Sequence, residues 1–248
     1  MSRLHPTVPG ARAGKPGVVV YTLNMSASRT PTRFDGVLFD LDGTLADTLE
    51  DLADAMNRVL RSEGLQEHSY DDYQRMIGHG IHRLVGDALP PGARDDETIA
   101  RCFDRMMEDY SAHSLVKTHL YDGIAELVRA LRAGGVKLAV FSNKADEATR
   151  RIVDGLFPAG SFDVVAGARP GVPLKPDPAG ALLVAARLGV APSGIVYVGD
   201  SPTDMRTAAA AGMRPVGVSW GFRTRDELVG AGAGTVLDRP LQLLDLSR

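Results

Sequence analysis

The sequence predicts an α/β fold built on a parallel sheet, with an all-helical segment inserted after the first strand. From residue 34 onward, short apolar runs alternate with segments of helical periodicity, which is typical of strands joined by crossover helices. Residues 48–119 interrupt this alternation, because they carry helical patterns and no strand pattern. The 248 residues suffice for one large domain with a smaller one inserted into it.

The core of this fold is expected in residues 34–47 and 120–248. Its strands are expected at residues 34–40, 136–142, 162–167, 195–200 and 215–218, with a short last strand at 236–237. The connecting helices are expected at residues 124–133, 146–156, 178–188 and 203–211. Three glycines, Gly134, Gly189 and Gly212, stand where the C-terminal caps of such helices belong.

Residues 48–119 are expected to form a helical cap. Asp47 and Glu50 have the spacing of a capping box that opens its first helix, and Ser69 with Asp72 resembles a second one. The cap holds 14 acidic and 8 basic residues, a net charge of about −6. Such a surface would repel the phosphate backbone of a nucleic acid, so a small substrate is the expected partner.

The remaining composition narrows the class of protein further. No apolar run approaches the roughly 18 residues that a membrane helix needs. The single cysteine, Cys102, excludes an intrachain disulfide and favours a reducing compartment, so the cytoplasm is the expected location. Residues 1–33 hold five basic residues and no acidic one, and their composition predicts a flexible tail. A transit peptide, or an extension upstream of a true start at Met25, remains an alternative.

Polar side chains stand at the ends of four predicted strands. They are Asp40 and Asp42 after the first strand, Ser142 at the end of the second, Lys175 after the third, and Asp200 and Asp204 after the fourth. In open parallel sheets, ligands bind at the carboxyl ends of the strands. The sequence therefore predicts one site to which four separate segments contribute.

Asp40 is the expected nucleophile of this site. Converging carboxylates repel one another unless a cation lies between them, and oxygen ligands suit Mg²⁺. We expect the metal to be bound by Asp40, the backbone carbonyl of Asp42, and Asp200. A carboxylate can attack phosphorus and form an aspartyl-phosphate. Phosphoryl transfer also needs positive charge around the phosphate oxygens, which Mg²⁺ and Lys175 supply.

Other groups have expected supporting roles. Asp42 is placed to protonate the leaving group and later to deprotonate the hydrolytic water. Ser142 and the backbone N–H groups of residues 40–45 are expected to bind phosphate oxygens, and Gly43 lets that turn approach closely. Asp204 either holds a metal-bound water, orients the lysine, or is simply an acidic residue at a helix start.

Four motifs of the haloacid dehalogenase-like hydrolases resemble these segments. They are Asp40-Leu41-Asp42-Gly43-Thr44-Leu45, Ser142-Asn143-Lys144, Lys175-Pro176-Asp177-Pro178 and Gly199-Asp200-Ser201-Pro202-Thr203-Asp204. The resemblance implies a Rossmann-like, doubly wound core, a helical cap after the first strand, Mg²⁺, and a supporting role for Thr44. Asn143 and Lys144 either contact substrate or cap the next helix.

Within that family, the chain is most similar to bacterial phosphoglycolate phosphatases. Ser142 stands where these usually carry Thr, and both supply a hydroxyl. The resemblance extends to Ile77-Gly78-His79-Gly80 in the cap and to Val198-Gly199-Asp200-Ser201, and it implies 2-phosphoglycolate as the substrate. The N–H groups of this turn, at a predicted helix start, can bind a carboxylate, and Arg83 one turn on can add charge. The alternatives are an ordinary glycine turn and a solvated arginine.

Three other functions share parts of this pattern. A dehalogenase would not need Asp42, so that residue disfavours it. A phosphomutase or pyrophosphatase would use the same core residues and stays open. A signalling receiver or other non-catalytic phosphate-binding protein belongs to a different class. A receiver would be shorter and lack the cap, and a pseudoenzyme would have lost one of Asp40, Asp42, Lys175 or Asp200.

Overall fold

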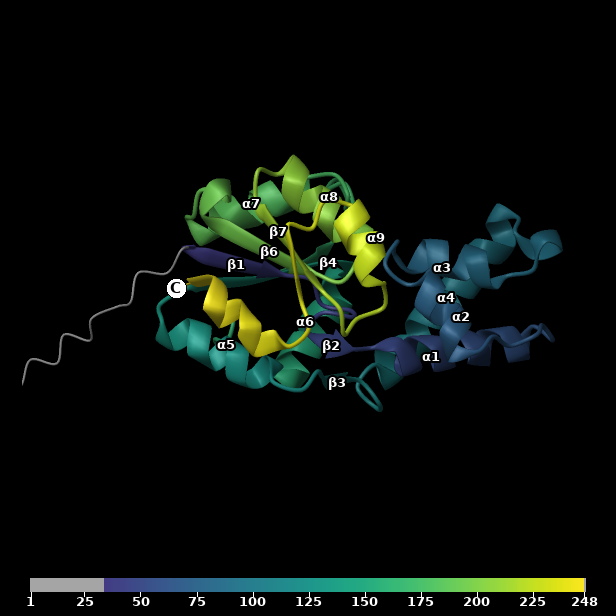
Figure 1. The fold of residues 1–248 in the computed structure, drawn as a ribbon. Helices are drawn as coiled ribbons and strands as arrows, with labels where there is room; N and C mark the ends of the chain where they lie inside the picture. Colours follow the sequence, from purple (N-terminus) through teal and green to yellow (C-terminus); the bar gives the residue numbers. More distant parts are fainter. Residues whose placement is uncertain (1–33, 248) are drawn as a thin grey trace, which may run out of the picture.

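The computed structural model describes residues 34–247, so the tail expected at residues 1–33 lies outside it. Its centre is a six-stranded sheet in which every pairing is parallel, in the order β5-β4-β1-β6-β7-β8 (Figure 1). The chain extends this sheet in both directions from β1, which confirms the doubly wound arrangement. The strands are β1 (Gly36–Phe39), β4 (Lys137–Ala145), β5 (Val164–Ala168), β6 (Ile195–Gly199), β7 (Arg214–Val218) and β8 (Thr235–Leu237).

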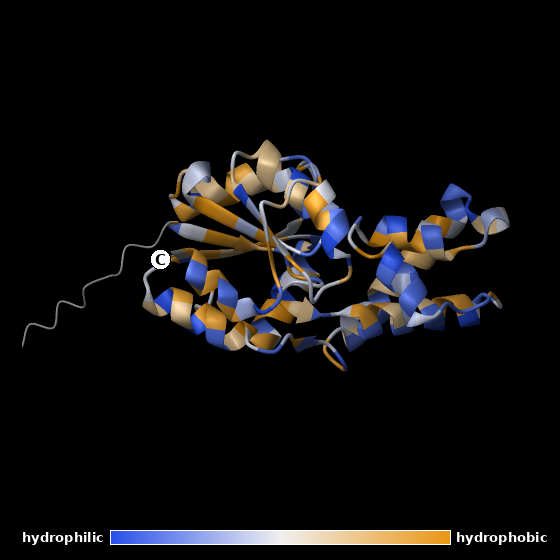
Figure 2. Ribbon diagram, viewed as in Figure 1, coloured by the Kyte–Doolittle hydropathy of each residue, from blue (hydrophilic) through white to orange (hydrophobic). Residues whose placement is uncertain are grey.

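Helices cover both faces of the sheet because successive strand residues point to opposite sides. In β1, Val37 and Phe39 pack with α5 and α6, whereas Leu38 packs with α7 and α8. Figure 2 shows the apolar residues gathered on the strands and on the sheet-facing sides of these helices. The helices of the core are α5 (Ile124–Ala133), α6 (Asp146–Leu156), α7 (Ala179–Leu188), α8 (Pro202–Ala210) and α9 (Arg225–Gly230), followed by the 3₁₀ segment η3 (Pro240–Ser247).

Four α-helices lie together at one end of this core (Figure 1). They are α1 (Leu49–Ser62), α2 (Tyr70–Met76), α3 (Ile81–Ala88) and α4 (Asp96–His113), with a 3₁₀ turn η1 (Pro91–Ala93) between the last two. Two short strands, β2 (Ala46–Asp47) and β3 (His119–Leu120), pair antiparallel where the chain leaves and re-enters the core. We propose this ribbon as the boundary between the core and a cap of residues 48–119. In residues 34–247, no helix has the length and apolar character required to cross a membrane.

The two expected capping boxes of the cap differ in outcome. The box at Ser69 and Asp72 is confirmed and opens α2. The box at Asp47 and Glu50 is wrong, because Asp47 belongs to β2 and the N-cap of α1 is Thr48, whose side chain makes no capping bond. The spacing of the two acidic residues does not reveal that the chain pairs as a strand in β2 just before α1 begins.

A buried carboxylate joins the two connections between cap and core. Asp51, in the first turn of α1, is 3% exposed. Its carboxylate accepts hydrogen bonds from the backbone N–H groups of Val116, Lys117 and Thr118 at 2.9–3.1 Å. These three donors belong to the segment that leads into β3, so one side chain ties the start of α1 to the returning chain.

Asp51→Ala is expected to lower the free energy of unfolding by about 2–4 kcal/mol, because it leaves three partly buried N–H groups without their acceptor. Urea denaturation measures this change. Asp54→Ala is the matched control, since Asp54 is a partly exposed residue of the same helix that pairs with Lys117, and a cost below about 1 kcal/mol is expected there. Equal costs for the two substitutions would contradict the role assigned to Asp51.

Candidate active site

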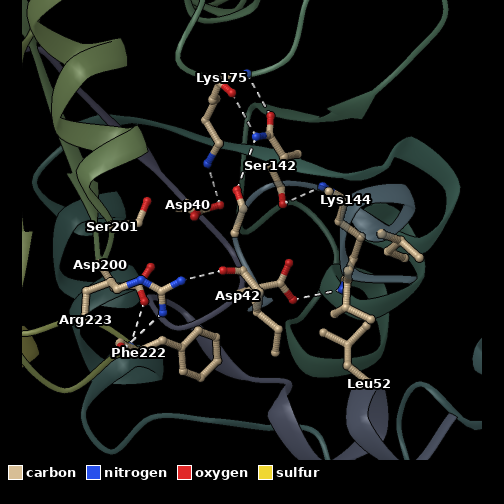
Figure 3. A pocket seen from close by; sticks show the side chains of 16 residues that line it. Asp40, Asp42, Leu52, Ser142, Lys144, Lys175, Asp200, Ser201, Phe222 and Arg223 are labelled. Atoms are coloured by element: carbon tan, nitrogen blue, oxygen red, sulfur yellow. Dashed lines mark hydrogen bonds and ion pairs between the residues drawn. The ribbon is translucent and has the colours of Figure 1, made fainter. Parts of the chain in front are cut away.

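A cavity lies between the carboxyl edge of the sheet and the cap, with a volume of about 40 Å³ (Figure 3). Its polar side chains are Asp40, Asp42, Ser142, Asn143, Lys144, Lys175, Asp200, Ser201 and Arg223, and apolar side chains of Leu52, Ile77, Ile81, Leu84 and Phe222 complete its wall. The structure therefore brings the polar ends of four strands to one place, as the parallel-sheet rule predicts.

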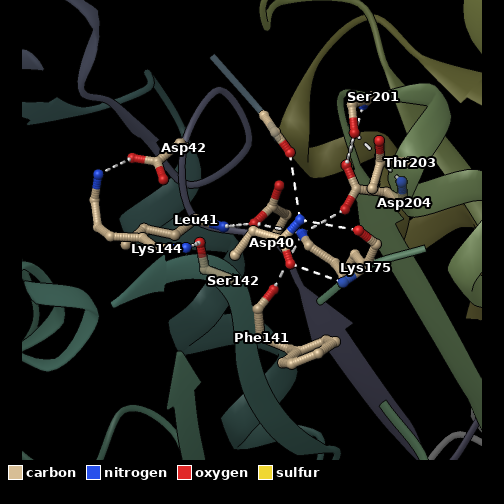
Figure 4. Close-up of polar contacts among 12 residues, drawn as sticks. Asp40, Leu41, Asp42, Phe141, Ser142, Lys144, Lys175, Ser201, Thr203 and Asp204 are labelled. Carbon is tan, nitrogen blue, oxygen red and sulfur yellow. Dashed lines mark hydrogen bonds and ion pairs between the residues drawn. The ribbon is translucent and has the colours of Figure 1, made fainter. Parts of the chain in front are cut away.

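Lys175 lies at the centre of the polar contacts (Figure 4). Its Nζ is 2.9 Å from Asp40 Oδ1 and 2.7 Å from Asp204 Oδ1, and its side chain is only 2% exposed. Burial alone would lower the pKa of Lys175, but Asp204 and Asp40 together raise it well above its usual value, so the side chain is an ammonium. The other oxygen of Asp204 accepts from the Ser201 hydroxyl in the capping box that opens α8.

Three buried carboxylates, from Asp40, Asp200 and Asp204, offer oxygens within 4.8 Å of one another. Burial raises the pKa of Asp40 and of Asp200, and Asp204 raises both further. Lys175 is the ion-pair partner of Asp40 and Asp204 in this cluster. Within residues 34–247, Asp40 Oδ2 and Asp200 Oδ1 have no hydrogen-bond partner. The cluster therefore fits a divalent cation, with Asp40 and Asp200 as its carboxylate ligands.

The position of Asp200 depends on two backbone segments. The N–H of Phe222, in the loop after β7, donates to Asp200 Oδ2 at 2.8 Å. Gly43, at φ +77°, lies so close that a Cβ there would overlap the Asp200 carboxylate. A side chain at residue 43 would thus be excluded both by the left-handed backbone and by contact with the site.

The carboxylate of Asp42 points toward Lys144 and away from Asp40 (Figure 4). Lys144 Nζ is 2.9 Å from Asp42 Oδ1, and the hydroxyl of Thr48 donates to the same oxygen at 2.5 Å. The Lys144 side chain is 2% exposed, and its Nζ is 4.8 Å from the ring centre of Tyr110 in the cap. Lys144 is therefore the counter-ion of Asp42, and no side chain caps α6.

The side chain of Asn143 hydrogen-bonds to the backbone of Lys175. It accepts from the Lys175 N–H at 2.8 Å and donates to the Lys175 carbonyl at 3.1 Å, and it also donates to the carbonyl of Gly78 in the cap. β4 runs three residues past its expected end at Ser142, and its register against β5 shifts there. The hydroxyl of Ser142, which lines the cavity, accepts from the N–H of Lys144.

The cap residues expected near the substrate divide into two groups. Gly78 and Gly80 line the cavity, and Gly80 is the N-cap of α3. His79 lines an adjacent groove between cap and core instead. Arg83 does not line the cavity, because it lies on the exposed side of α3 and pairs with Asp87 at 2.8 Å. Of the cap residues expected at the substrate, only the two glycines lie against the cavity.

Thr44 also lies outside the cavity lining. It is fully buried, and in the described part of the chain its hydroxyl has no hydrogen-bond partner. Its carbonyl accepts from Trp220 Nε1 at 3.0 Å, which anchors the loop after β7. Phe222 and Arg223 in this loop were missed by sequence reasoning. They follow the fifth predicted strand, so the rule that singled out the ends of the other strands would also have drawn attention to this loop.

Comparison with known proteins finds similarity to the family whose motifs the sequence resembles. The sequence profile of the haloacid dehalogenase-like hydrolases matches residues 37–218. The chain is 36% identical over 209 residues to the phosphoglycolate phosphatase of Rhodospirillum rubrum, covering 82% of this chain and 86% of the relative. It is also similar to a crystal structure from Lactobacillus delbrueckii subsp. bulgaricus assigned as a phosphoglycolate phosphatase, with TM-score 0.79, 32% identity and coverage of 85% and 96%. CbbY from Rhodobacter sphaeroides, solved in complex with phosphate, has TM-score 0.73, 26% identity and coverage of 85% and 96%.

Proposed function

Because the chain belongs to the haloacid dehalogenase-like hydrolases, we propose that it is a Mg²⁺-dependent phosphatase that hydrolyses 2-phosphoglycolate. One observation carries the proposal. Asp40 lies in the cavity with one oxygen bound by Lys175 and the other free of hydrogen-bond partners within residues 34–247. A carboxylate in that state is held in place and still has an oxygen available for attack.

In the proposed reaction, Asp40 attacks phosphorus and the ester bond breaks, leaving an aspartyl-phosphate. Asp42 lines the same cavity and gives a proton to the departing oxygen. In the second step Asp42 takes a proton from water, which hydrolyses the aspartyl-phosphate and releases inorganic phosphate. Lys175 and the Ser142 hydroxyl bind the phosphate oxygens, and bound Mg²⁺ would offset the negative charge of phosphate and carboxylates.

The proposed metal ligands are Asp40, Asp200 and the backbone carbonyl of Asp42. Asp204 acts on the metal indirectly, since both of its oxygens are engaged by Lys175 and Ser201. A divalent cation beside these carboxylates would offset the mutual repulsion that helps to raise the pKa of Asp40 and of Asp200. Oxygen ligands with room for water are the coordination that Mg²⁺ prefers.

The size of the cavity supports a small leaving group. Its volume of about 40 Å³ leaves space for only a few water molecules. The backbone N–H groups at the start of α3, next to Gly78 and Gly80, are the proposed site for the carboxylate of the leaving glycolate. The relatives from Rhodospirillum rubrum and Nitrosospira multiformis, at 36% and 35% identity, are named phosphoglycolate phosphatases, which supports the same substrate.

A screen of phosphate esters tests this substrate. The purified protein is assayed with 2-phosphoglycolate, hexose phosphates and pyrophosphate, and kcat/KM is compared. We expect 2-phosphoglycolate to rank first and hexose phosphates to be poorer by about 10²-fold or more, because a larger leaving group keeps the cap from closing. A higher kcat/KM for pyrophosphate, or transfer of phosphate between sugars, would instead indicate one of the two related functions left open by the sequence.

Removal of the metal is expected to stop turnover reversibly. Treatment with a chelator should abolish activity, and added Mg²⁺ should restore it. Mg²⁺ should also raise the melting temperature of the metal-free protein, since it binds the folded state and offsets its buried carboxylates. Activity that is indifferent to the chelator, together with an unchanged melting temperature, would contradict the proposed metal site.

A further inference from the structure

Arg223 reaches from the core to the cap. It follows β7, and its guanidinium donates hydrogen bonds to the carbonyls of Gln74 at 2.5 Å, Arg75 at 3.1 Å and Ile77 at 2.8 Å. All three carbonyls lie at the C-terminal end of α2 in the cap, where a helix leaves carbonyls without partners. A positive charge at this end of a helix is also favourable toward its dipole. A single core side chain therefore satisfies one end of a cap helix.

The cap also donates a hydrogen bond to the loop that carries Arg223. The side chain of Gln74 donates back to the carbonyl of Phe222 at 3.2 Å. The neighbouring Arg75 side chain is not available for this role, because it pairs with Asp72 on the exposed side of α2. Residues 222 and 223 and the end of α2 are thus linked by four hydrogen bonds across the boundary between core and cap.

The loop that carries Arg223 also reaches the reacting groups. The N–H of Phe222, the preceding residue, donates to the carboxylate of Asp200. Trp220, two residues earlier, donates to the carbonyl of Thr44, which lies in the turn that follows Asp40. Figure 3 shows Arg223 and Phe222 beside Asp200 at the cavity. The position of the cap and that of a proposed metal ligand are therefore connected through one short loop.

The cavity lies between the cap and the core, so its width depends on the position of the cap. Ile77, Gly78 and Leu84 of the cap line it together with Asp40 and Asp200 of the core. Moving the end of α2 away from the core breaks the bonds of Arg223, and closing the cap forms them again. Arg223 thus contributes to the free-energy difference between the open and the closed cap.

We propose that Arg223 is a positioning residue that holds the cap closed over bound substrate and joins this closure to the placement of Asp200. The inference rests on the proposed function, since it assumes a phosphate ester bound beneath the cap. Arg223 makes its hydrogen bonds to α2 only when the cap is closed, so these bonds stabilise the closed cap relative to the open one. Loss of Arg223 favours the open cap, so substrate binding must supply more of the free energy of closure.

Steady-state kinetics test the first consequence. In Arg223→Gln, KM for 2-phosphoglycolate is expected to rise about 10- to 100-fold, as the loss of two or three charge-assisted hydrogen bonds predicts. The value of kcat should stay within about threefold, because saturating substrate still closes the cap. Arg223→Lys should fall in between, since an ammonium cannot reproduce the planar fork of donors. Arg225→Gln is the matched control and should change neither constant, because its guanidinium hydrogen-bonds to Val236 and Asp238, which both belong to the core.

The fluorescence of Trp220 gives a readout that does not depend on turnover. It is the single tryptophan of the chain, and it lies in the loop that carries Arg223. Titration of the parent with orthovanadate in MgCl₂ should change this fluorescence as the cap closes. The midpoint should move to about 10- to 100-fold higher vanadate in Arg223→Gln and stay in place in Arg225→Gln.

The two measurements separate the inference from the proposed function. A shifted vanadate midpoint in a protein that does not hydrolyse 2-phosphoglycolate would support the role of Arg223 and reject the substrate. Efficient hydrolysis by the parent, with KM and midpoint of both Arg223 variants within twofold of it, would overturn the role of Arg223. A lower melting temperature of Arg223→Gln with unchanged KM and midpoint would overturn it as well, since that is the result of a purely structural contact.

Discussion

Asp40→Asn is expected to lower kcat for 2-phosphoglycolate by about 10⁴-fold or more while the protein stays folded. The amide retains the size of the carboxylate but cannot act as its nucleophile. Stability should not fall. Burial and then Asp204 raise the pKa of Asp40 well above its usual value even though Lys175 lowers it, so the folded state disfavours the charge that the substitution removes. Thermal melting of the metal-free protein near pH 7 should show an equal or higher melting temperature.

The control for this substitution is Asp35→Asn. Asp35 is exposed and precedes β1, at the opposite end of the same strand from Asp40. The activity of the Asp35→Asn variant should equal that of the unsubstituted protein. Acid quenching during turnover of radiolabelled substrate, followed by peptide mapping, should place the label on the peptide containing Asp40. Label on another residue, or near-parental activity of Asp40→Asn, would reject the aspartyl-phosphate mechanism.

The fold was predictable because its signals are local. In β1, adjacent residues such as Val37 and Leu38 pack on opposite faces, and apolar runs of this kind mark strands buried on both sides. The helices α5 and α6 match their expected bounds because glycine and acidic residues mark their ends. The ribbon of β2 and β3 was missed, since two-residue strands far apart in sequence leave no periodicity to detect.

The site was predictable as far as the strand-end rule reaches. That rule led to Asp40, Lys175 and Asp200, which lie in one cavity as expected. It did not reveal that Lys144 pairs with Asp42, because the partner of a buried charge depends on the side-chain directions set by the irregular end of β4. The same rule extends to the loop that carries Arg223, but it does not reveal the contact that Arg223 makes. Its partners are backbone carbonyls of a cap helix, and carbonyls carry no residue identity that a sequence pattern can register.

Lys175→Met is expected to reduce both stability and activity. The ammonium is the counter-ion of Asp40 and Asp204, at 2.9 and 2.7 Å. Its loss leaves two buried carboxylates without their counter-ion, which costs about 3–5 kcal/mol of unfolding free energy. It also removes a cation from the phosphate oxygens, so kcat should fall by about 10²–10³-fold or more. Urea denaturation and steady-state kinetics measure the two effects. Lys137→Met is the control, because Lys137 is 53% exposed and its pair with Asp163 should contribute less than about 1 kcal/mol.

A second substitution separates the two roles of Lys175. In Lys175→Met/Asp204→Asn, one buried carboxylate is neutralised, so most of the lost stability should return. Activity should not return, because no cation replaces the ammonium beside the substrate phosphate. Added Mg²⁺ should stabilise Lys175→Met by more than it stabilises the parent, since no ammonium then shares the carboxylates with the ion. Recovery of activity along with stability in the double variant would mean that Lys175 serves only to balance charge in the fold.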